Sequence, residues 1–150
     1  MAQDKFEARE IHPRVAALLQ KADWLYLHEC VLDDNRRVDF VALNPRSGHI
    51  AIVECKAAVT SVSSLAEQVN HYHQRFGAPD AFKWVFVWET PHNRTVVRLM
   101  EHHIQVFDMD SEPSVSPISA SVGHKAKRIF WETFKKFHPD IWAAWGWDDD

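Results

Sequence analysis

Residues 38–56 read VDFVALNPRSGHIAIVECK, and this stretch decides the fold. Two apolar runs, each ending or beginning near a charged residue, are separated by the turn-forming sequence Asn-Pro-Arg-Ser-Gly. A connection this short joins antiparallel neighbours, so the stretch predicts a β-hairpin. With the loop centred near Arg46 and Ser47, Asp39 and Glu54 fall nearly opposite each other, within a cross-strand reach of about 5 Å.

The sequence on either side extends the hairpin into a larger sheet. Apolar residues recur at helical spacing upstream and downstream, and strand-like runs lie between them. The expected elements are a helix over 4–23, strands over 24–32, 36–44 and 49–57, a helix from about 61 to Gly77, a strand over 81–89, a short helix over 94–101 and a strand over 104–109. This order predicts an α/β fold in which a mixed β-sheet, an antiparallel three-stranded meander plus further strands, is flanked by helices.

Length and composition predict a single domain. The chain has 150 residues, of which 46% are hydrophobic and 25% charged, enough to form an ordinary globular core. We expect one domain over 1–150, with a C-terminal helix at about 121–138 and an acidic, Trp-rich tail at 139–150. No apolar run approaches the roughly 18–20 residues of a membrane span, and the first residues are polar. A cytoplasmic protein without membrane contact is therefore expected.

Charge and cysteine content exclude two other classes of protein. The net charge of −4 argues against a protein that coats nucleic acid through a broad basic surface, although three of the negative charges lie at Asp148, Asp149 and Asp150. A local basic groove therefore remains compatible with the composition. Cys30 and Cys55 lack the spacing and partners of a zinc knuckle or iron–sulfur site, so we expect two buried free thiols.

The charged residues near the hairpin ends suggest a site. Alternation places Asp39 on the face opposite Val38 and Phe40, and it places Glu54 and Lys56 on one face of the next strand. Charges at the ends of apolar strands are costly to bury unless something compensates them, and a divalent cation such as Mg²⁺ would do so. An ion there could activate water for attack on a phosphate, with the lysine orienting the water or stabilising charge. The alternative is an exposed cross-strand salt bridge.

Together these residues resemble a known motif. Asp39 precedes Glu54 by fifteen residues, and Glu54-Cys55-Lys56 ends an apolar strand, which is similar to the core motif of the PD-(D/E)XK nuclease superfamily. Gln68 and Tyr72, four apart on the next helix, resemble the Gln-x-x-x-Tyr motif of its RecB-like branch. The resemblance covers roughly residues 7–90. It departs from the pattern where valine replaces the proline before Asp39, and where the cysteine cluster of some members is missing.

The resemblance implies a restriction-endonuclease-like core and an activity. The expected function is Mg²⁺- or Mn²⁺-dependent hydrolysis of phosphodiester bonds in DNA, or in RNA, during repair, recombination or defence against foreign DNA. The implied metal ligands are Asp39, Glu54, the carbonyl of Cys55, and an acid of the first helix, Glu10 or Glu7. Lys56 would be the catalytic base or charge stabiliser.

Further residues each have a functional assignment and an alternative. Gln68 and Tyr72 would support the site or contact the substrate, or else they are ordinary helix residues with the tyrosine in the core. Arg37 lies near enough to bind substrate. Glu10 could instead be a solvated first-turn acid, and Glu29 could face the site or the solvent. A homodimer or a larger DNA-processing complex would have to supply strand selection.

Two other functions remain open from the sequence. A catalytically inactive module with the nuclease fold would bind nucleic acid or a partner protein without needing metal. A metal-dependent enzyme could also act on a phosphoester other than nucleic acid.

Overall fold

The structure is a computed structural model that describes residues 6–32, 34–76 and 81–109, together with residues 132, 135, 136 and 139. Its elements are η1 (Glu7–Ile11), α2 (His12–Lys21), β1 (Leu25–Val31), β2 (Arg37–Leu43), β3 (Ile50–Lys56), α3 (Val62–Phe76), β4 (Phe82–Val87), α4 (Asn93–Glu101) and β5 (Ile104–Asp108). The predicted C-terminal helix and tail lie outside the described residues, apart from the four scattered positions.

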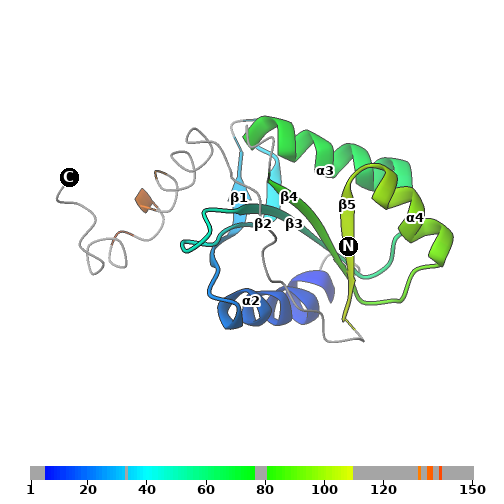
Figure 1. Ribbon diagram of the computed structural model, residues 1–150, viewed down its shortest axis with the longest axis horizontal. Helices are drawn as coiled ribbons and strands as arrows, with labels where there is room; N and C mark the ends of the chain where they lie inside the picture. The colour runs from blue at the N-terminus through cyan, green and yellow to red at the C-terminus, as the bar shows by residue number, and fades with distance from the viewer. Residues whose placement is uncertain are drawn as a thin grey trace.

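The strands form one five-stranded sheet in the order β1-β2-β3-β4-β5 (Figure 1). The first three strands are antiparallel, and β4 and β5 run parallel to β3. Parallel neighbours need a crossover, which α3 provides between β3 and β4, and α4 between β4 and β5. The predicted fold class is confirmed: a mixed α/β sheet made of an antiparallel meander and further strands, with helices on its faces.

The β2–β3 hairpin has the predicted register. Leu43 pairs with Ile50, so the loop centre falls between Arg46 and Ser47. Inside the loop, Oδ1 of Asn44 accepts hydrogen bonds from the N–H groups of Arg46 and Ser47 at 3.1 and 3.2 Å. Gly48 has φ 77°, a conformation that costs glycine little. The turn chemistry therefore sets which residues of the two strands face each other.

Two layers of helices bury the sheet. On one face, η1 and α2 pack Ile11, Val15 and Leu19 against the sheet, and each of these side chains is 0% exposed. On the other face, α3 and α4 cover the strands, as Figure 1 shows. β4 is buried along most of its length, as expected for a strand with apolar residues at almost every position. Both cysteines are free and buried, which confirms that prediction.

The first helix begins with an irregular turn. The predicted helix over 4–23 starts as the π-helix η1, in which the N–H of His12 donates to the carbonyl of Glu7 five residues earlier. Pro13 follows at the start of α2 and has no N–H to donate, which disfavours a continuous α-helix across this point. The wider turn changes which side chains share a face at the start of the chain.

β1 and β2 also lose their regular alternation at one place. Their ladder pairs His28 with Phe40 and Cys30 with Val38, and Glu29 between them has φ 52°. Beyond this point Val38 packs into the cluster that contains side chains of α3, whereas Phe40 packs with α2. The prediction that Val38 and Phe40 share the face opposite the acid between them is therefore wrong, because the strands are irregular there.

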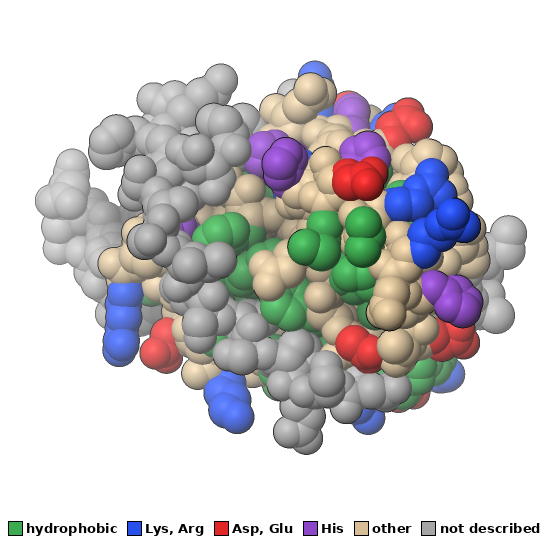
Figure 2. Space-filling model, turned by 45° about the vertical axis from the view of Figure 1, so that its right-hand side comes forward, with side chains coloured by type: hydrophobic (Ala, Val, Ile, Leu, Met, Phe, Trp, Pro, Cys, Tyr) green, Lys and Arg blue, Asp and Glu red, His purple; other side chains and the backbone are tan. Residues whose placement is uncertain are grey.

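The face of the molecule that carries α4 and β5 has mixed charge. Figure 2 brings forward the side of the molecule that carries α4 and β5, and there acidic and basic side chains surround a few hydrophobic ones. Val97 and Met100 of α4 are the more exposed apolar side chains of this region, at 54% and 60%. Within the described ranges, no helix combines the length and apolar character needed to cross a bilayer.

Candidate active site

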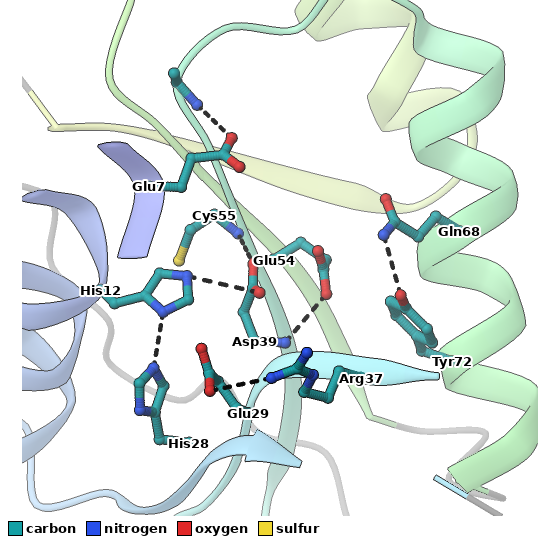
Figure 3. A network of polar contacts seen from close by, with 11 residues as sticks. Glu7, His12, His28, Glu29, Arg37, Asp39, Glu54, Cys55, Gln68 and Tyr72 are labelled. Atoms are coloured by element: carbon teal, nitrogen blue, oxygen red, sulfur yellow. Dashed lines mark hydrogen bonds and ion pairs between the residues drawn. The ribbon is translucent and has the colours of Figure 1, made fainter. Parts of the chain in front are cut away.

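Asp39 and Glu54 meet where β2 and β3 separate. The ladder between the two strands ends at Phe40 and Val53, and the next residues are linked through side chains instead. The N–H of Asp39 donates to Oε1 of Glu54 at 3.2 Å, and the N–H of Cys55 donates to Oδ2 of Asp39 at 2.7 Å (Figure 3). Each carboxylate is therefore held by a backbone group of the opposite strand.

Burial makes this carboxylate pair costly when it is ionised. Glu54 is 2% exposed, and its pKa lies well above the usual value because of burial first and the charge of Asp39 second. The positive charge of Lys56 partly opposes that rise. When Asp39 and Glu54 are both ionised, the single positive charge of Lys56 leaves part of their negative charge uncompensated. The donor set fits a hard divalent cation, which binds carboxylate oxygens and keeps waters for a phosphate.

The pair opens onto a cavity of about 350 Å³. Its wall contains Arg37, Asp39, Glu54, Lys56 and Gln68, so the structure brings together five residues predicted from the sequence. The carboxylate pair, together with Arg37 and Lys56 in the same lining, suits an anionic ligand held through a metal ion. The alternative of an exposed salt bridge does not fit, because the glutamate is buried.

Gln68 and Tyr72 of α3 lie at different depths, Gln68 on the cavity wall and Tyr72 in the core. Gln68 lines the cavity and donates from Nε2 to the hydroxyl of Tyr72 at 3.0 Å. Tyr72 is 4% exposed and belongs to the core, where burial chiefly raises its pKa, with a smaller contribution from the carboxylates. The structure therefore places Gln68 where a substrate could touch it, and Tyr72 behind it as a support.

The acid supplied by the first helix is Glu7. Its side chain lines the cavity, and its Oε2 accepts a hydrogen bond from the N–H of Ala57 at 2.8 Å, just beyond the end of β3. Glu10 pairs instead with Arg9 at 3.3 Å and does not line this cavity. The assignment of Glu10 to the site is corrected, because a π-helical turn directs residues three apart to different sides.

His12 is a site residue that the sequence pattern did not reveal. Its ring is 5% exposed and lines the cavity, with Nε2 at 3.6 Å from Oδ1 of Asp39. His12 and Glu7 are five residues apart, a spacing that brings side chains together in a π-turn but not in an α-helix. Glu29, which the sequence allowed to face either the site or the solvent, also lines the cavity and forms an ion pair with Arg37 at 3.4 Å.

Cys55 contributes through its backbone. Its thiol is buried on the α2 side of the sheet, and burial raises the pKa of that thiol well above its ordinary value. The thiol therefore stays protonated and is a poor metal ligand. The predicted role of the Cys55 carbonyl as a third ligand stays a prediction.

No protein-family model matches this chain, and no curated protein matches its sequence. Two solved structures are similar in fold. One is a protein of unknown function from Silicibacter pomeroyi, with a TM-score of 0.56 and 14% identity over 96% of this chain and 94% of that chain. The other is a repair endonuclease from Pyrococcus abyssi, with a TM-score of 0.49 and 12% identity. That match covers 76% of this chain, which spans 47% of the endonuclease.

These similarities concern the fold. The protein from Silicibacter pomeroyi shares it over nearly the whole length of both chains. The antiparallel meander and the two crossovers agree with the mixed α/β fold predicted from the sequence.

Proposed function

We propose that this chain is a Mg²⁺- or Mn²⁺-dependent nuclease that hydrolyses phosphodiester bonds of DNA. The observation that carries the proposal is the Asp39–Glu54 pair, in which Glu54 is buried. Each carboxylate accepts a hydrogen bond from the backbone of the opposite strand, and both face a cavity shared with Lys56. The Gln68–Tyr72 hydrogen bond supports a place in the RecB-like branch of the PD-(D/E)XK superfamily.

Each residue has a defined part in this mechanism. Asp39 and Glu54 would hold the ion through their carboxylates, and Lys56 would orient the attacking water or stabilise negative charge that develops on the phosphate. A bound Mg²⁺ or Mn²⁺ would lower the pKa of a water molecule and offset charge on the phosphate. Arg37 and Gln68, on the cavity wall, would bind the phosphate backbone on either side of the reacting bond.

The test is cleavage of a panel of substrates by the purified protein. Single-stranded, double-stranded and branched DNA, RNA and a small phosphodiester should be incubated with Mg²⁺, Mn²⁺ or EDTA. We expect metal-dependent cleavage of at least one form of DNA. Cleavage of the small ester but of no nucleic acid would identify a different phosphoesterase, and metal-independent DNA binding without any cleavage would identify a binding module.

Replacing Lys56 should remove most of this activity. We expect Lys56→Gln to lower the cleavage rate on the order of 10²–10³-fold, because it removes a cation on the cavity wall whose charge acts on Glu54. Lys21→Gln is the matched control, since Lys21 is an exposed lysine at the end of α2. Equal activity of the two variants in a single-turnover assay would rule out a catalytic role for Lys56.

Tyr72→Phe should have a smaller effect through Gln68. The change removes the hydroxyl that accepts the Gln68 hydrogen bond and keeps the ring that packs in the core. A hydrogen bond of this kind contributes about 0.5–1.5 kcal/mol, so we expect roughly a 2- to 12-fold loss of kcat/KM. Gln68→Ala should lower kcat/KM at least as much. If Tyr72→Phe alone were the more damaging change, the tyrosine would act on the substrate directly.

A further inference from the structure

His12, His28 and Glu29 form a second cluster at the edge of the cavity. Nδ1 of His12 lies 2.7 Å from Nε2 of His28, and one possible ligand atom from each of the three residues lies within 4.8 Å of the others. Figure 3 shows the side chains of α2 and β1 pointing toward one another beside Asp39. The proposed Mg²⁺ site uses none of these three side chains as a ligand.

The backbone brings these groups together at a cost. Adjacent residues of a regular strand point to opposite faces, yet His28 and Glu29 both reach His12. The irregularity of β1 explains this, because Glu29 has φ 52°, in the left-handed region. A residue other than glycine pays about 1–2 kcal/mol for that conformation, and such strain is concentrated at functional sites.

The three donors differ in kind from the carboxylate pair. Two imidazole nitrogens with one carboxylate suit first-row transition metals, whereas two carboxylates suit Mg²⁺. We propose that His12, His28 and Glu29 form a second metal site, which binds a transition-metal ion such as Zn²⁺ or Mn²⁺. Ligand nitrogens around tetrahedral Zn²⁺ lie roughly 3.3 Å apart, so the two rings need to separate by only about 0.6 Å.

The surroundings support this ligand set. The ring of His28 stacks against Phe40 with the two ring centroids 4.8 Å apart, which holds Nε2 of His28 beside His12. With Nδ1 of His12 on the metal, Nε2 carries the proton and faces Oδ1 of Asp39 at 3.6 Å. A carboxylate behind a metal-bound histidine is a common second partner in metal sites. The second ion would thus help to position Asp39.

One competing set of ligands is disfavoured. His12, Asp39 and Cys55 also offer atoms within 4.8 Å of one another. However, Cys55 is 1% exposed, and it packs in the hydrophobic cluster on the α2 side of the sheet, away from solvent. Glu29 is the better third ligand, because its ion pair with Arg37 uses Oε2 and leaves the other oxygen to the metal.

The test uses Co²⁺, whose visible absorption reports on its ligands, and it does not depend on cleavage. Metal-free Glu54→Gln protein should be titrated with Co²⁺, because this change removes charge from the first site while its oxygen can still accept the Asp39 N–H. We expect one Co²⁺ per chain, with bands characteristic of nitrogen ligation. Adding His28→Gln or Glu29→Gln should weaken binding at least 10-fold, whereas adding His92→Gln, an exposed histidine before α4, should not.

Two results would overturn the proposal. One is a Glu54→Gln protein that binds no Co²⁺, and the other is binding that survives both His28→Gln and Glu29→Gln. Circular dichroism of each variant shows that it is folded, which is expected because both side chains are exposed. Loss of cleavage in Glu54→Gln with Co²⁺ binding retained would separate this site from the proposed catalytic one.

Discussion

Glu54→Gln should abolish metal-dependent cleavage, with a loss on the order of 10³-fold or more in kcat. The substitution is nearly isosteric, and the amide oxygen can still accept the hydrogen bond from the Asp39 N–H that Oε1 of Glu54 accepts now. Only the charge that would bind the metal ion is lost. The rate should be measured in single turnover on the best DNA substrate, at saturating Mg²⁺ and Mn²⁺.

Glu67→Gln is the matched control for this experiment. Glu67 lies in α3, is exposed, and carries the same charge outside the cavity wall. The Glu67→Gln protein should cleave DNA at the wild-type rate. A Glu54→Gln protein that kept more than a tenth of wild-type activity would show that Glu54 does not bind the catalytic ion.

The position of this pair could be predicted because it depends on little of the chain. A five-residue turn between two apolar runs sets the hairpin register, and the register alone makes Asp39 face Glu54. The order of the remaining strands and helices followed from hydrophobic periodicity. The hairpin register and the order of the elements could be predicted because each depends on a local sequence pattern.

Prediction failed where the backbone leaves its regular period. Because of the π-turn in η1, Glu7 rather than Glu10 lines the cavity, and His12 lies beside Asp39. The repeat of an α-helix does not allow this arrangement. The left-handed φ of Glu29 brings adjacent side chains of β1 to one side. Propensities of single residues do not reveal such irregularities, because tertiary packing around the site stabilises them.

The same Glu54→Gln substitution should stabilise the metal-free protein. In the folded state burial and Asp39 raise the pKa of Glu54, so the folded protein holds this proton more tightly than the unfolded chain does. Removing an uncompensated buried charge should raise the free energy of unfolding by about 1–3 kcal/mol near pH 8. For a chain of this size each kcal/mol corresponds to roughly 2–4 °C in Tm.

This gain should depend on pH in a defined direction. Below pH 4.5, the ordinary pKa of a glutamate side chain, Glu54 is protonated in both the folded and the unfolded wild-type protein, and the charge has no cost. As pH rises from there through the raised folded pKa, the unfolded chain loses its proton first, so wild-type stability falls. The Glu54→Gln protein lacks this loss, and the difference in Tm between the two proteins should therefore grow with pH.

Thermal unfolding in EDTA at several values between about pH 5 and pH 8 measures the effect, with Glu67→Gln as the control whose difference from wild type stays constant. Adding Mg²⁺ or Mn²⁺ at pH 8 should raise the Tm of the wild-type protein, since ligands that bind only the folded state stabilise it. Mg²⁺, which binds carboxylates rather than the His12–His28–Glu29 donor set, should stabilise Glu54→Gln far less. A Glu54→Gln protein less stable than wild type in EDTA at pH 8 would mean that Lys56 already compensates the buried charge, and the main physical reason for placing a cation there would be lost.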